Sequence, residues 1–153
     1  MAQLGHDPLE GSLCLGMRRR FTATEANRAL VLVKRIVADV VRHYGRLLDL
    51  QETIEAALAA GARTQFGLAR DALVRAAGEL HECLSELQDV GVEVRDYSQG
   101  IVDFPCVVGG REVCLCWQHG EGAVAHWHEA DEGFAQRRPI EQLESWELLV
   151  APR

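Results

Sequence analysis

Residues 100–140 hold most of the side chains in this sequence that could do chemistry. They include two of the three tryptophans, three of the six histidines and three of the five cysteines of the chain. His126 and His128 are two residues apart, a spacing that turns both imidazoles to the same side of a β-strand. With a carboxylate from Asp103, Glu121 or Glu129, they could bind one zinc, iron or manganese ion. This pattern is typical of a metal-binding protein or a metal-dependent enzyme.

Other residues of the same stretch could bind a ligand without a metal. Trp117 and Trp127 could form an aromatic wall, although tryptophan more often packs in a core. Arg137 could bind a carboxylate or a phosphate, or pair with a neighbouring acidic side chain. Cys114 and Cys116 could be soft metal ligands, redox thiols or small buried side chains. The candidate ligand-binding residues are Asp103, Trp117, Glu121, Trp127, Glu129 and Arg137.

No complete catalytic motif accompanies these residues. The sequence contains no phosphate-binding glycine loop, nucleophile elbow or Cys-x-x-Cys pair. We therefore expect first a binding or regulatory module, not an enzyme, with a site for a small ligand or a protein partner on the β segment. The metal-dependent protein built on the His-x-His pair is the alternative.

The placement of these side chains depends on a predicted hairpin turn at Gly109-Gly110. Two adjacent glycines between apolar runs are typical of a two-residue β-hairpin loop. If they form the loop, residue 108 pairs with residue 111 and the register of both strands follows. One face of the hairpin then carries only apolar side chains, namely Val102, Phe104, Cys106, Val113, Leu115 and Trp117.

The opposite face of that hairpin is predicted to be the chemical one. It carries Asp103, Cys114 and Cys116, with Asp103 directly across from Cys116. A third strand within residues 123–129 follows. If Trp127 packs in the core, the His-x-His pair lies beside these three residues.

Two long amphipathic helices precede the β segment. Thr22 and Glu25 form a capping box at the start of the first helix. Apolar residues then recur every three or four positions, and Gly61 and Gly91 are the expected stops. Thr64 is the expected N-cap of the second helix, and the short linker makes the two helices antiparallel. The predicted helices span about residues 23–60 and 65–90.

The first helix carries more apolar surface than one partner helix can cover. Val31, Ile36, Val41 and Leu48 form a second stripe beside the first. We expect both the β segment and a second subunit to cover it, which predicts a homodimer through the long helices. The predicted fold is α+β, a long antiparallel helical hairpin followed by a small, mainly antiparallel β-sheet packed against it over about residues 92–140.

Composition limits the classes of function. The 153 residues suffice for one domain, and the net charge of −7 disfavours nonspecific nucleic-acid binding. No apolar run approaches the roughly 20 residues of a membrane span, and no secretory signal is present. Five cysteines, an odd count, favour reduced thiols and a cytoplasmic location.

The two ends of the chain lack a clear periodic pattern. We expect residues 1–20 to be a flexible tail or an extension of the gene model ahead of a start at Met17. Residues 21–153 would form a single domain, in which residues 141–153 dock as a last short element.

Several short motifs occur together over residues 21–140. They are Phe21-Thr22, Glu25-Ala26-Asn27, Val102-Asp103-Phe104-Pro105, Leu115-Cys116-Trp117, Gly120-Glu121, Trp127-His128-Glu129, Gly133-Phe134, Arg137 and Pro139-Ile140. In this combination the sequence resembles an uncharacterised bacterial family, domain of unknown function 2203, which has no established activity. The resemblance implies that a shared function rests on Asp103, Glu121, Trp127, His128, Glu129 and Arg137. His126 and Cys114 stand where the family commonly has tyrosine or another aromatic residue.

Overall fold

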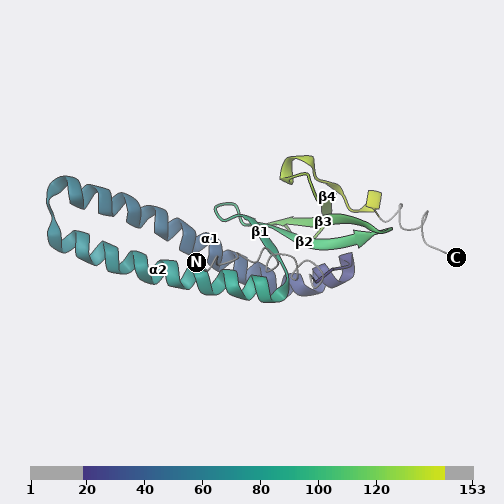
Figure 1. Cartoon of the computed structure of the whole chain (residues 1–153), viewed down its shortest axis with the longest axis horizontal. Helices are drawn as coiled ribbons and strands as arrows, with labels where there is room; N and C mark the ends of the chain where they lie inside the picture. The colour runs from purple at the N-terminus through teal and green to yellow at the C-terminus, as the bar shows by residue number, and fades with distance from the viewer. Residues whose placement is uncertain (1–18, 144–153) are drawn as a thin grey trace, which may run out of the picture.

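The computed structural model describes residues 19–143 as a long helical hairpin that carries a small β-sheet on one side (Figure 1). The elements are α1 (Ala23–Ala60), α2 (Arg63–Val90), β1 (Glu93–Asp96), β2 (Ile101–Val108), β3 (Arg111–Gln118), β4 (His126–Glu129), the 3₁₀ helix η1 (Phe134–Gln136) and β5 (Arg138–Pro139). The strands lie in the order β1-β2-β3-β4-β5, and each pair is antiparallel. The predicted α+β fold is confirmed. The predictions for residues 1–18 and 144–153 lie outside the described residues.

Three of the four predicted helix ends are confirmed, and the fourth is not. The capping box is present, because the Glu25 amide donates to Thr22 Oγ1 at 3.1 Å and the Thr22 amide donates to the Glu25 carboxylate at 3.3 Å. Gly61 and Gly91 end α1 and α2 as expected. The prediction of Thr64 as the N-cap of α2 was wrong, since α2 begins at Arg63 and has no side-chain cap. The chain reverses within two residues after α1, so the second helix starts before residue 64.

The sheet packs its apolar face on the first half of α1. The predicted hairpin register is confirmed, with Val108 opposite Arg111 and Phe104 opposite Leu115. All six side chains predicted for the apolar face are buried in one core with residues of both helices. Trp127 joins the same core and is only 5% exposed. In the described part of the chain, no helix combines the length and apolar character needed to cross a membrane.

Specific contacts hold the sheet at the start of α1. The Asn27 side chain donates to the Val124 carbonyl at 3.2 Å and accepts from the Val124 amide at 2.9 Å. The Phe21 amide donates to the Pro105 carbonyl at 2.7 Å. The guanidinium of Arg19 lies 4.5 Å from the centre of the Phe21 ring. These bonds satisfy backbone groups that would otherwise be buried without partners.

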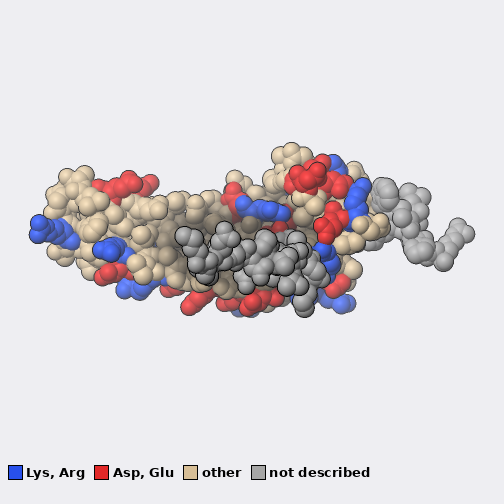
Figure 2. All heavy atoms as spheres, viewed as in Figure 1, with Lys and Arg blue, Asp and Glu red and all other residues tan. Residues whose placement is uncertain are grey.

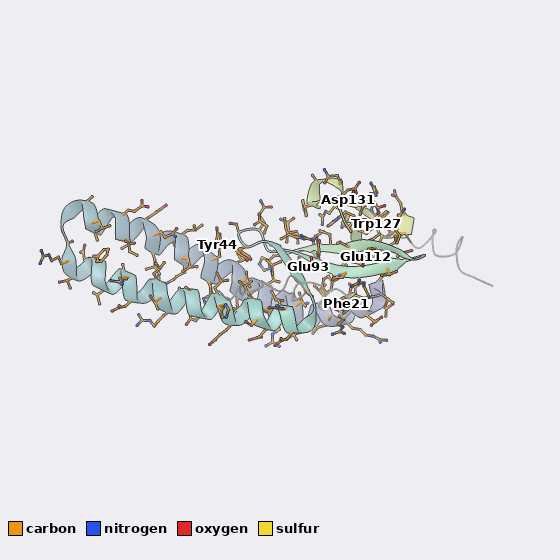
Figure 3. All side chains as sticks on the ribbon, in the orientation of Figure 1. Phe21, Tyr44, Glu93, Glu112, Trp127 and Asp131 are labelled. Atoms are coloured by element: carbon orange, nitrogen blue, oxygen red, sulfur yellow. The ribbon has the colours of Figure 1, made fainter. Side chains whose placement is uncertain are left out.

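The far half of the helical hairpin extends beyond the sheet, and we call this part, residues 45–60 and 63–78, the arm (Figures 1 and 2). Tyr44 marks its beginning, because its ring meets the Tyr97 ring of the β1–β2 turn at 5.5 Å (Figure 3). Beyond that contact, Leu50, Ala69 and Ala76 form a separate small core between the helices.

Gly100 is the last residue of the turn between β1 and β2, and it packs closely against α1. A Cβ on this residue would lie 2.8 Å from Val37 Cγ1 and 2.7 Å from His119 Cβ, and its φ is +66°. We predict that Gly100→Ala lowers the free energy of unfolding by about 3 kcal/mol. The added methyl group would overlap with Val37 and His119, and alanine would also have to adopt a left-handed backbone conformation. Gly110→Ala is the control, since its φ is +79° with nothing within 4 Å, and it should cost about 1 kcal/mol. Equal losses in urea denaturation would show that contact with α1 is unimportant.

Candidate functional site

Asp103 and His128 meet on the face of the sheet that points away from the helices. Asp103 lies on β2 and His128 on β4, and the strand between them, β3, presents Cys114 and Cys116 to the same face. The side chains of Asp103 and His128 meet across β3, and Asp103 Oδ1 lies 3.0 Å from His128 Nε2. Both residues are 1% exposed, so this contact is a buried polar pair in the middle of the sheet.

Arg95 holds the second oxygen of Asp103. Its Nε donates to Asp103 Oδ2 at 2.8 Å, and its Nη2 donates to Glu93 at 2.9 Å. The register between β1 and β2 shifts between Val94 and Asp96, which leaves Arg95 as the extra residue of a bulge. A bulge re-aims a side chain, and here it accompanies the contact of Arg95 with the buried carboxylate.

His128 has an acceptor at each ring nitrogen. Its Nδ1 lies 2.7 Å from the Glu129 carbonyl, and its Nε2 faces the Asp103 carboxylate. A carbonyl oxygen can only accept, so Nδ1 carries the proton in this contact. A neutral ring then points a lone pair at the carboxylate, so the contact is favourable only with a proton or another cation between the two atoms. The hydrogen bond with Asp103 raises the pKa of His128 above its ordinary value, more than burial lowers it.

Cys114 completes a group of potential metal ligands. One ligand atom each from Asp103, Cys114 and His128 lies within 4.8 Å of the other two, and no other such group of three occurs within residues 19–143. Burial and the charge of Asp103 raise the pKa of Cys114 to about 11 and that of Cys116 to about 12. Both are therefore neutral thiols near pH 7 unless a cation lies beside them.

Glu121 forms a separate cluster with Arg137 and His126 on the same face. The Glu121 carboxylate accepts from Arg137 Nη1 and from the Gln118 amide, each at 2.7 Å. The Glu121 carbonyl accepts from Trp117 Nε1 at 3.1 Å. His126 Nδ1 lies 3.5 Å from the Glu121 carboxylate without the geometry of a hydrogen bond. This cluster connects the loop after β3 to the segment that carries Arg137.

The remaining predicted site residues lie on the helix-facing side of the sheet. Trp117 and Trp127 are buried in the core. The Glu129 carboxylate pairs with Arg111 at 2.8 Å, and only its carbonyl oxygen contacts His128. In Figure 3, Trp127 lies beneath the loop that carries Asp131. The structure thus brings Asp103 and His128 together, with Glu129 touching His128 through its carbonyl oxygen, whereas His126 lies outside the ligand group and both tryptophans are in the core on the opposite face.

The sequence pointed to Cys114 only as one of two possible soft metal ligands, and it did not point to Arg95, whose side chain is half exposed. Cys114 was assigned to the correct face by strand alternation, and its position beside His128 follows once the register of β4 is known. Arg95 could not be found in this way, because no sequence pattern announces the bulge after Val94.

The hydrogen bonds to Glu121 predict a pH dependence of stability. Partial burial alone would raise the pKa of Glu121, but the bonds from Arg137 and Gln118 outweigh it and hold the pKa below 4.5. The carboxylate therefore stabilises the fold above pH 4.5, and this contribution is lost as the pH falls through the lower, folded-state pKa. At pH 7 we expect Glu121→Gln to cost about 1–2 kcal/mol of unfolding free energy.

The difference in unfolding free energy between wild type and Glu121→Gln should shrink as the pH falls from 7 to 3. Denaturant titrations of both proteins over this range measure it. Glu141→Gln removes an exposed acid and is the control, with an expected change within about 0.5 kcal/mol. A gap between wild type and Glu121→Gln that stays constant over this range would contradict the assignment.

Comparison with known families agrees with the motifs noted in the sequence. A family model described as "Uncharacterized conserved protein (DUF2203)" matches residues 19–140, which is most of the chain. That description assigns no activity to its members. No curated protein and no solved structure matches the chain. The protein therefore belongs to DUF2203, the family of uncharacterized conserved proteins to which its motifs pointed.

Proposed function

We propose that this protein binds one divalent metal ion, most favourably zinc, through Asp103, Cys114 and His128. The observation that carries the proposal is the 3.0 Å contact between Asp103 Oδ1 and His128 Nε2, a buried contact that needs a proton or another cation between the two atoms. A metal ion satisfies both atoms at once. The sulfur of Cys114, within 4.8 Å of each, supplies a third ligand.

The spacing of the donor atoms suits a small ion. Zinc lies about 2.0–2.1 Å from nitrogen and oxygen ligands. Two such atoms at the observed 3.0 Å would subtend an angle of roughly 95° at the ion. A tetrahedral angle needs a separation of about 3.3 Å, so the two side chains would move apart by a few tenths of an ångström. A mixed set of thiolate, imidazole and carboxylate favours zinc over magnesium or calcium.

The surroundings of the three ligands support the same proposal. Metal-bound histidines usually donate their second ring nitrogen to a carbonyl or carboxylate, as His128 does to Glu129. Arg95 holds the second carboxylate oxygen of Asp103. A cavity of about 110 Å³ borders the site, since Cys114 and Arg95 are among the residues that line it. Three protein ligands leave a fourth position for water or a small ligand.

Metal analysis of untagged protein tests the proposal. We expect about one zinc per chain in the wild type, and loss of most of it in His128→Gln and in Cys114→Ala. His126→Gln is the matched control, because His126 lies next to Cys116 on the same sheet face but outside the ligand group. Circular dichroism should show that the variants are folded.

A metal-free wild type after growth with added zinc would contradict metal binding and leave a proton-bridged Asp103–His128 pair in its place. Loss of zinc in His126→Gln to the same degree as in His128→Gln would contradict the ligand set.

Cobalt substitution tests the sulfur ligand separately. Cys114 should give a thiolate-to-cobalt charge-transfer band in the near ultraviolet, absent in Cys114→Ala and retained in Cys116→Ala. Because the pKa of Cys114 is about 11 without a cation, cobalt binding near pH 7 should release one more proton from the wild type than from Cys114→Ala. A band that persists in Cys114→Ala would assign the sulfur ligand to another cysteine.

A further inference from the structure

One side of the arm is a strip of mixed apolar and polar side chains that continues the surface under the sheet. Positions 37, 41, 44, 48, 51, 55 and 58 of α1 are spaced by alternating steps of four and three, so they share one side of the helix. Near the sheet this side is covered, because the turn at Gly100 lies against Val37 and Val41, and Tyr97 meets Tyr44. Beyond Tyr44 the cover ends. Leu48 and Leu58 are 43% and 62% exposed.

The start of α2 widens this strip. Phe66 lines a shallow hollow together with Leu58, so both lie on the same side of the arm. Spacing continues that side of α2 from Phe66 through Arg70 to Leu73. Figure 2 shows that the side of the arm turned toward the viewer is largely free of charged atoms, which gather along its edges and end. The strip carries one acid, Glu55, and one base, Arg70, so its formal charges cancel within each copy.

We propose that the strip binds the same strip of a second copy of this chain, in a two-fold dimer with antiparallel arms. A two-fold axis along the arms would bring the two sheets into collision, because each sheet lies on the strip side at the same end of its hairpin (Figure 1). The axis therefore runs across the arms. This arrangement makes an antiparallel four-helix bundle with a sheet at each end.

The register of the dimer follows from the length of the arm. An overlap centred near residue 53 places Leu48 of each copy against Leu58 of the other, and Gln51 against Glu55. The arm is roughly 25 Å long at 1.5 Å per residue, and two adjacent helices are about 20 Å wide. The footprint is roughly 500 Å² per copy, at the lower limit for a specific interface. We therefore expect the dimer to form only at higher protein concentration.

Sedimentation velocity of the full-length chain over a range of concentrations tests the dimer. We expect a mass approaching twice the chain's 16.9 kDa at high concentration. Replacing two central leucines, in Leu48→Glu/Leu58→Glu, should weaken the dimer at least tenfold. Leu68→Glu is the control, since Leu68 is 66% exposed on the arm but outside the strip. A wild type that stays monomeric, or a control that weakens the dimer equally, would overturn the proposal.

A disulfide cross-link tests the register. In Leu48→Cys/Leu58→Cys the two new thiols of one chain are ten residues apart on one helix, about 15 Å, too far to bridge each other. Oxidation should therefore give a covalent dimer, which the identically treated wild type, whose native Cys83 is partly exposed, should not form. Absence of that dimer overturns the register. The result is independent of the metal proposal, because the strip contains none of the three metal ligands, and both assays are run with and without a chelator.

Discussion

Gly109 and Gly110 let the chain reverse in two residues, and this reversal fixes which side chain of β2 lies opposite which side chain of β3. Strand alternation then separates two kinds of surface. The apolar side chains pack on α1, and the polar and thiol side chains lie on the other face. A slip of one residue would turn Asp103 toward the helices, where an unpaired carboxylate costs several kcal/mol or more. The helix packing and the buried Asp103–His128 pair therefore depend on the same register.

The sequence was sufficient for the two helices and the β2–β3 hairpin because each of these elements carries its own local pattern. The capping box at Thr22 and the stops at Gly61 and Gly91 define both helices almost to the residue. The paired glycines define the hairpin and its two faces. The prediction of Thr64 as the N-cap was wrong because the preference of threonine for N-cap positions does not indicate how tightly a two-residue linker turns.

The candidate site could be predicted only in part, because its geometry depends on elements that lack such patterns. Strand alternation placed His126 and His128 on one face, but it did not say which of them meets Asp103. The β3–β4 register sets that choice, and it places Cys114 rather than His126 in the group with His128. Arg95 and Arg137 reach the face through a bulge and an irregular segment. Each contributes through one long side chain whose direction no periodicity indicates.

Asp103 Oδ1 and His128 Nε2 meet in a buried site where a proton or another cation must lie between them, and the proposed zinc ion would fill that role with Cys114 as a third ligand. X-ray absorption at the zinc edge of the native protein tests this most directly. The predicted spectrum shows one sulfur near 2.3 Å and nitrogen or oxygen ligands at about 2.0–2.1 Å. A shell of nitrogen and oxygen alone would contradict the account, because the zinc would then lie away from Cys114.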